Sequence, residues 1–263
     1  MKVEILPSGA SWPISQASHT VRWAPMLRML KRWRHERVVA ESYDAAAPFY
    51  DNWEWQRLWR KTEWPQLRSF LDAPQRVLEI GIGTGAIACR ILDENPSIDA
   101  YVGIDISPGM LARCRAVLGD RVQLINEDVA LVDFATLGGQ FDFILSCRML
   151  GHIQMPFDLF SQVKPVLAGD GRFIVTDIDP GHGYTATRLP TNYGRVEVPT
   201  FKHNQQDVIA AAERAGLRLD RFLRTYEDEA LAEAGDQAPS SLSGRMGPLF
   251  NMFVFKQAPQ QSV

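Results

Sequence analysis

The stretch "RVLEIGIGTGAIACRIL", residues 76–92, decides the fold of this chain. Residues Val77–Gly81 are mostly aliphatic and indicate a buried strand that stops at Gly81. From Thr84 to Leu92 the apolar residues recur at helical spacing. Three glycines, at every second position from Gly81, therefore lie on a strand-to-helix turn. At such a turn the chain reverses and its backbone comes close to another group, here a ligand.

The composition is that of a soluble globular enzyme. The chain has 263 residues, of which 46% are hydrophobic and 22% are charged, and it has no apolar run of membrane-spanning length. Its three cysteines form no CxxC pair, which indicates a reducing compartment without a zinc site or a disulfide framework. We therefore expect a cytoplasmic protein with no membrane span.

The charge is unevenly distributed. The net charge is −3, which gives no general attraction to nucleic acid, but residues 1–40 hold seven basic and only two acidic side chains. An amphipathic helix over residues 21–39 explains this basic segment as a packing arm or as the contact of a homodimer. A mitochondrial presequence is the alternative, because such segments are rich in Arg and Ser and poor in acidic residues.

Strand and helix patterns alternate from residue 76 onward, which is typical of a parallel sheet covered by helices. Strands are expected at 77–80, 100–105, 122–126, 141–146 and 172–178, and helices at 84–94, 108–117, 129–137, 155–168 and 204–216. Two final strands, "LRLDRFLRTYE" and "LFNMFVF", have no helix between them, so they pair antiparallel. The predicted fold is α/β: a Rossmann-like seven-stranded sheet, mostly parallel with the last strand antiparallel, and helices on both faces.

The chain is predicted to have three parts. Residues 1–70 form an N-terminal arm and helical cap, residues 71–257 the main domain, and residues 258–263 a frayed tail. Residues 180–203 are too long for an ordinary connection, so we expect an inserted lid.

Carboxylates follow the first three strands in register. Glu79 lies two residues before the first glycine, Asp105 ends the second strand and Asp128 follows the third. Asp105 is placed to bind two ribose hydroxyls, and Asp128 to accept a bond from an adenine amino group. A role in helix capping or turns is the alternative for each of the two aspartates.

Several motifs resemble those of the class I S-adenosylmethionine-dependent methyltransferases: "VLEIGIGTG", "GIDISPGML", "NEDVA" and "FDFILSCRMLGHI". The resemblance covers residues 75–178 well and extends loosely to 256. It implies S-adenosylmethionine as the cofactor and a methyltransferase domain as the fold. The segment "SYDAAAPFYDNW" also resembles the cap that precedes many of these domains. The implied cofactor-binding residues are Tyr43, Tyr50, Glu79, Gly81, Gly83, Gly85, Asp105, Ile106, Met110, Asp128, Val129 and Cys147.

Methyl transfer needs a base only where the nucleophile carries a proton. His152 lies about one helical turn beyond the fourth strand, so it is the first candidate base, with His182 and His203 of the insertion as rivals. Side chains in the same two segments are candidate substrate contacts: Arg148, Tyr184 and Tyr193.

The spacing D-x-D-x-x-H of Asp177, Asp179 and His182 also matches a metal site. A strand end and an Asp-Pro turn explain the two aspartates better, so no metal is predicted.

The function predicted from the sequence is methyl transfer to the oxygen, nitrogen or carbon of a small apolar or aromatic metabolite, in natural-product biosynthesis. A methyltransferase acting on RNA or protein is the alternative, although no RNA-binding module is recognisable. A cofactor-binding scaffold without catalysis is a third class, and intact cofactor motifs argue against it.

Overall fold

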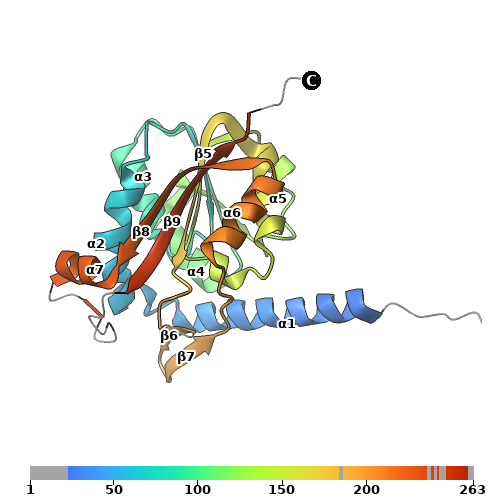
Figure 1. Ribbon diagram of the computed structural model, residues 1–263. Coiled ribbons are helices and arrows are strands. Elements are labelled where there is room, and N and C mark those ends of the chain that lie inside the picture. Colours follow the sequence, from blue (N-terminus) through green and yellow to red (C-terminus); the bar gives the residue numbers. More distant parts are fainter. Residues whose placement is uncertain (1–22, 184–185, 236–237, 240–241, 243–246, 260–263) are drawn as a thin grey trace, which may run out of the picture. The chain divides into compact units, whose positions relative to one another are not determined.

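A seven-stranded sheet in the order β3-β2-β1-β4-β5-β9-β8 forms the centre of the fold (Figure 1). The five strands β1 to β5 run parallel, whereas β9 runs antiparallel to both β5 and β8. The predicted fold class is therefore confirmed, but the expectation of no helix between the last two strands is wrong, because α7 (Glu227–Ala234) lies between β8 and β9. The strands are β1 (Arg76–Ile80), β2 (Ala100–Asp105), β3 (Gln123–Asn126), β4 (Phe141–Cys147), β5 (Leu167–Ile178), β8 (Leu217–Tyr226) and β9 (Pro248–Gln257).

The computed structural model describes residues 23–183, 186–235, 238–239, 242 and 247–259, with side chains from residue 34 onward. The chain divides into two units, residues 1–34 and 35–263. The arm before residue 23, Tyr184 and most of the predicted tail lie outside the described residues. The division at residue 70 between cap and main domain stays a prediction.

Helices cover both faces of the sheet because each presents one apolar side to it. On one face, Phe160 of α5 (Pro156–Val166) is fully buried together with Phe173 of β5 and Phe255 of β9. On the opposite face, Ile91 of α3 (Ala86–Glu94) and Cys114 of α4 (Pro108–Leu118) are buried. None of the described helices is long and apolar enough to cross a membrane. The α-helices are α1 (Trp23–Ala46), α2 (Glu54–Arg68), α3 (Ala86–Glu94), α4 (Pro108–Leu118), α5 (Pro156–Val166), α6 (Gln205–Arg214) and α7 (Glu227–Ala234).

The predicted helix over residues 129–137 is wrong. That segment holds only a single 3-10 turn, η3 (Phe134–Thr136). Two aspartate side chains hold local turns instead, because Asp128 accepts the Ala130 amide at 3.0 Å and Asp133 accepts the Ala135 amide at 3.1 Å. Such side-chain bonds to the backbone compete with helix formation.

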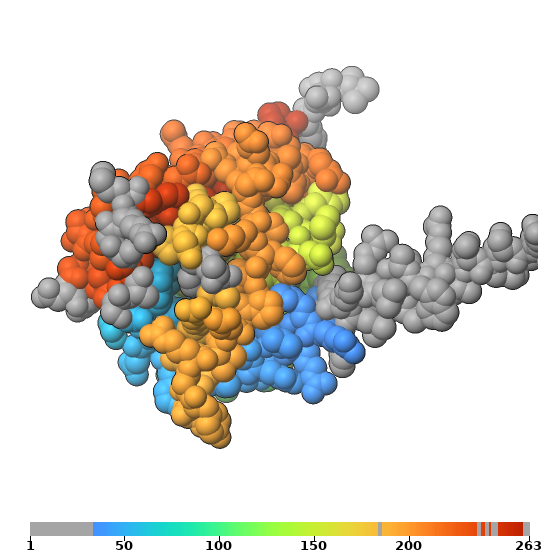
Figure 2. Space-filling view, turned by 60° about the horizontal axis from the view of Figure 1, so that its bottom comes forward, coloured from blue at the N-terminus to red at the C-terminus, as the bar shows by residue number. Residues whose placement is uncertain are grey.

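The insertion contains a two-stranded hairpin, β6 (Thr187–Thr191) and β7 (Gly194–Val198). Its inner residues Leu189 and Val198 are fully buried against Val39 of α1 and Met110 of α4. The hairpin and the part of α1 around Val39 therefore lie side by side (Figure 2).

The cap is joined to the sheet by two aspartates, each of which follows a tyrosine in the sequence. Asp44 of α1 accepts the Ser107 hydroxyl at 2.5 Å and the Gly109 amide at 2.8 Å, at the start of α4. Asp51, in the 3-10 turn η1 (Tyr50–Asn52), accepts the Thr84 hydroxyl at 2.5 Å and Arg113 at 2.9 Å. Both anchors thus end on the loops that follow β1 and β2.

Replacing Asp51 by Ala tests the anchor. We expect the free energy of unfolding to fall by about 1–3 kcal/mol, because Thr84 and Arg113 lose their acceptor. We also expect the emission of the cap tryptophans to shift to the red as the cap loosens. The matched control is Glu41→Ala on α1, whose carboxylate forms only an exposed pair with Arg37. Equal unfolding curves for the two variants would contradict the anchor.

Candidate active site

The glycine-rich turn after β1 has a backbone geometry that favours glycine. Gly81, Gly83 and Gly85 have φ of +80°, +56° and +82°. A Cβ added at Gly85 would lie 2.8 Å from Cys114 Sγ, so that glycine allows α3 to pack on α4. No atom lies within 4 Å of a Cβ added at Gly83. The backbone at Gly83 is therefore open to a ligand.

Asp105, at the end of β2, links this turn to the start of α4. Its carboxylate accepts the Gly83 amide at 2.8 Å and the Ser107 amide at 2.9 Å, one on each oxygen. Burial raises its pKa to about 6. Each oxygen keeps a lone pair, which suits two neighbouring hydroxyl donors. The open glycine turn and this carboxylate therefore fit the adenosine part of S-adenosylmethionine.

The residues predicted for the adenine end lie beyond β2 and β3. Ile106 is partly buried, and Met110 is 1% exposed because it packs under the cap. Val129 packs against the core, and Asp128 holds the turn described above. Their roles toward adenine stay predictions.

Glu79 lies beneath the glycine turn and is 2% exposed. It accepts a hydrogen bond from the Tyr101 hydroxyl at 2.5 Å, and burial raises its pKa to about 8. Cys147, the last residue of β4, is also buried, and this burial raises the pKa of its thiol well above the usual range. The thiol is thus protonated at neutral pH, and the cofactor-binding role of Cys147 stays a prediction.

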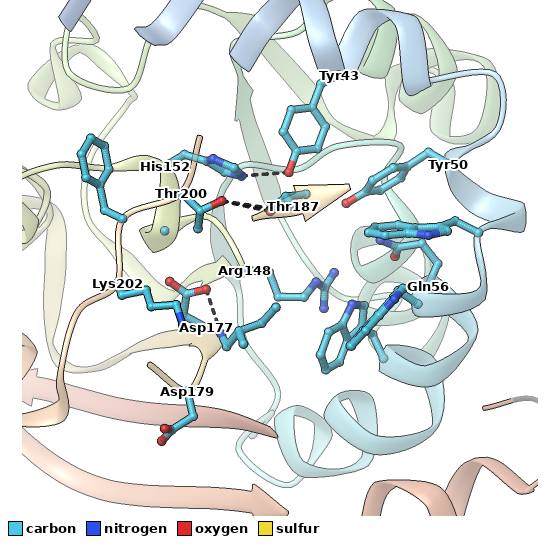
Figure 3. Close-up of a pocket in the computed structure, with 16 residues that line it drawn as sticks. Tyr43, Tyr50, Gln56, Arg148, His152, Asp177, Asp179, Thr187, Thr200 and Lys202 are labelled. Carbon is cyan, nitrogen blue, oxygen red and sulfur yellow. Dashed lines mark hydrogen bonds between the residues drawn. The ribbon is translucent and has the colours of Figure 1, made fainter. Parts of the chain in front are cut away.

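A pocket lies at the carboxyl ends of β4 and β5, beside the glycine turn (Figure 3). A Cβ added at Gly81 would lie 2.9 Å from Met149, in the loop that forms one wall. Tyr50 experiences the charges of both Arg148 and Asp105, so it lies between the pocket and the predicted ribose site. The aromatic lining residues are Tyr43, Tyr50, Trp53, Trp55, Trp59 and Phe201.

One buried donor lines the pocket without a hydrogen-bond partner among the described residues: Trp53 Nε1. A buried donor left unpaired costs about 1–3 kcal/mol. A ligand that offers an oxygen acceptor to this group therefore recovers that cost.

Arg148 lies in the middle of the aromatic wall. Its φ is +57°, a conformation that side-chain-bearing residues rarely adopt. Its guanidinium lies 5.5 Å from the centre of the Trp59 ring and forms an ion pair with the buried Glu63. The Thr176 hydroxyl also donates to Glu63. Strained backbone of this kind clusters at functional sites.

His152 lines the pocket, as predicted for a candidate base, but its surroundings disfavour a proton. Its Nε2 lies 2.9 Å from the Tyr43 hydroxyl, and burial lowers its pKa to about 4. The imidazole is neutral at physiological pH, and its protonated form is too acidic for an effective general base there.

The other histidines of the insertion are held elsewhere. His182 Nε2 lies 2.7 Å from Glu227 Oε1, and His203 Nε2 lies 2.8 Å from the Ile153 carbonyl. Neither lines the pocket. Tyr193 is 93% exposed at the tip of the hairpin, so the structure does not place it at the pocket. The catalytic roles of His182 and His203 and the substrate role of Tyr193 rest only on their position in the insertion, and they stay predictions.

The structure also brings in residues that the sequence did not single out for this site. Asp177 and Asp179 both line the pocket, and Asp179 is in addition bound by Asn251 at 2.9 Å and by Arg224 at 3.1 Å. Among the described residues, no group of three or more His, Cys, Asp or Glu side chains is arranged to hold a metal ion. The position of Asp177 at the end of a predicted strand is the sequence feature that could have identified it as a pocket residue.

The pKa of His152 can be tested by titration. Between about pH 6.5 and 4 an unfolded histidine binds a proton while buried His152 does not, so lowering the pH destabilises the folded state. Relative to His152→Gln, the parent should lose up to about 3 kcal/mol of unfolding free energy over this range. Proton NMR identifies the ring signal of His152 by its absence from His152→Gln. In the parent this signal should titrate near pH 4. A midpoint near 6.5 would contradict the burial argument.

Comparison with known proteins agrees with this arrangement. A family model described as a methyltransferase domain matches residues 78–173. A malonyl-[acyl-carrier protein] O-methyltransferase of Geobacter sulfurreducens is 29% identical over 200 residues, which are 65% of this chain and 72% of the relative.

Two further similarities cover more of the chain. A polyamine aminopropyltransferase of Chromobacterium violaceum is 30% identical over 208 residues, 73% of this chain and 74% of the relative. The structure of a DhpI–SAH complex covers 86% of this chain and 98% of that chain with a TM-score of 0.61, at 16% identity, and so shares the fold. The family model and the methyltransferase relative, together with the sheet order, assign the chain to the class I S-adenosylmethionine-dependent methyltransferases.

Proposed function

We propose that this methyltransferase acts on a small, largely aromatic metabolite held under the cap, as expected for natural-product biosynthesis. The observation that supports this most is the aromatic pocket beside the glycine turn. Planar rings of Tyr43, Tyr50, Trp53, Trp55 and Trp59 suit a planar acceptor, because offset and edge-to-face ring pairs are favourable.

The proposed roles of the residues follow from their positions at the carboxyl ends of the strands. The backbone of Gly81, Gly83 and Gly85 and the carboxylate of Asp105 hold the cofactor. Bound there, S-adenosylmethionine supplies an electrophilic methyl group. Arg148, His152 and the cap residues form the acceptor side of the same edge of the sheet. Open α/β sheets bind ligands at this edge.

The pocket is small and covered. Its cavity volume is about 50 Å³, whereas pockets for drug-sized ligands have volumes of about 300–1,000 Å³. The cap and the hairpin segment both contribute walls, so one of them moves aside when an acceptor enters. This enclosure favours a free metabolite over a residue within an RNA or protein.

Aminopropyl transfer to a polyamine is the second candidate, because one relative has that activity in its name. A polyamine is a flexible, extended chain without a ring. The aromatic wall of the pocket suits a planar acceptor better. The shape of the pocket therefore favours methyl transfer to an aromatic acceptor.

The test is a transfer assay with S-adenosylmethionine labelled in its methyl group. The protein is incubated with a metabolite extract and, separately, with total tRNA and total protein. We expect the label in a low-molecular-weight aromatic product detected by mass spectrometry. The control is Phe201→Ala, on the pocket wall away from the cofactor residues, which should raise the KM for that acceptor and leave the affinity for S-adenosylhomocysteine unchanged.

Label in RNA or protein alone would contradict the proposal. A product that instead gains an aminopropyl group from decarboxylated S-adenosylmethionine would favour the second candidate.

A further inference from the structure

Asp177 is a carboxylate in the acceptor pocket that no role above uses. It lies at the end of β5, next to the loop that follows β4 (Figure 3). The register of the two strands pairs Cys147 with Thr176, and the Arg148 amide donates to the Thr176 carbonyl at 2.8 Å. Arg148 and Asp177 therefore leave neighbouring strands side by side.

The backbone fixes the orientation of this carboxylate. Its Oδ1 accepts the Ile178 amide at 2.8 Å, and the Gly151 amide also interacts with it. No side chain among the described residues donates a hydrogen bond to Asp177. A carboxylate has about four acceptor positions, so positions remain for a ligand in the pocket.

We propose that Asp177 accepts the proton of the acceptor and that the acceptor is a hydroxylated aromatic compound, methylated on oxygen. This proposal rests on the proposed function. Two features of the pocket support this choice of substrate class. The aromatic wall suits the ring, and the unpaired donor of Trp53 suits an oxygen acceptor.

The step balances as follows. The oxygen–methyl bond forms while the methyl–sulfonium bond of the bound cofactor breaks, and that electron pair returns to sulfur, which leaves a neutral thioether. The hydroxyl proton passes to Asp177 and then to water. Asp177 must therefore be ionised before the step.

The surroundings of Asp177 raise the pKa of its carboxyl group to near neutral pH. Burial raises its pKa to about 7, although the Ile178 and Gly151 amides and the charge of Arg148 oppose this rise. A base of this pKa gains its ionised form as the pH rises through about 7, so the rate should rise over the same range. The other charged or titratable groups that line the pocket are Tyr43, Tyr50, His152, Asp179 and Lys202.

Two of these groups, Lys202 and Asp179, are bound by other residues. Lys202 donates to the carbonyls of Pro180 at 3.2 Å and His182 at 3.1 Å. Asp179 is paired with Arg224, and His152 stays neutral above about pH 4. Asp177 is thus the carboxylate of the pocket without a side-chain partner among the described residues.

The experiment compares the parent with Asp177→Asn on para-substituted phenols of decreasing acidity. For weakly acidic phenols we expect kcat to fall by about 10²–10⁴ in the variant, because the proton has no acceptor. For 4-nitrophenol, which ionises in water near neutral pH, the loss should be small. With a weakly acidic phenol, we expect the rate of the parent to rise through about pH 7 and then level off, and that of the variant to keep rising as the phenol itself ionises. A residue that only supports the structure would slow all phenols equally.

A second readout needs no turnover. With S-adenosylhomocysteine bound, the absorbance of 4-nitrophenol reports its ionisation in the pocket. A neighbouring carboxylate disfavours the phenolate, so the bound probe should ionise at a higher pH in the parent than in Asp177→Asn. Equal ionisation in both proteins would overturn the role of Asp177.

The matched control is Asp170→Asn, at the exposed beginning of the same strand, which should behave as the parent. If Asp177→Asn does not fold, Asp177→Ser replaces it. Calorimetry with S-adenosylhomocysteine distinguishes a wrong substrate class from a wrong proposed function. Cofactor binding without binding or methylation of any phenol would overturn the substrate class alone, whereas absent cofactor binding would overturn the proposed function.

Discussion

The carboxylate of Asp105 is the interaction on which the rest of the site depends. It joins the glycine turn, through the Gly83 amide, to the start of α4, through the Ser107 amide. The same two loops receive the cap, because Thr84 donates to Asp51 and Ser107 donates to Asp44. One carboxylate thus joins the two loops that are proposed to hold the cofactor and that bind the cap.

The repeated Tyr-Asp pairs of the cap explain how the two sites are brought into register. In each pair the aspartate bonds to a loop after β1 or β2, and the tyrosine lines the pocket. The rings of Tyr43 and Tyr50 contact each other edge-on, with centroids 6.0 Å apart. The loops after β1 and β2 and the aromatic wall of the pocket are therefore joined through neighbouring residues of the same segment.

The sheet could be predicted from sequence because strand and helix patterns are local, and the carboxyl-edge position of Asp105 followed from them. The helix at 129–137 was mispredicted because Asp128 and Asp133 hold turns that apolar spacing does not show. The pairing of Arg148 with Glu63 and the ties of His182 and His203 join segments that are distant in sequence. Such contacts, and the burial that lowers the pKa of His152, arise only from tertiary packing.

The most direct test of the central role of Asp105 is a calorimetric titration of Asp105→Ala with S-adenosylhomocysteine. The account predicts that the affinity falls by about 1–3 kcal/mol, roughly 5- to 150-fold, since the ribose hydroxyls lose a charged acceptor and the turn loses its tie. The matched control is Asp99→Ala, exposed just before the other end of β2, which should bind as the parent does. An affinity of Asp105→Ala equal to that of the parent, or tight binding of NAD in place of S-adenosylhomocysteine, would contradict the account.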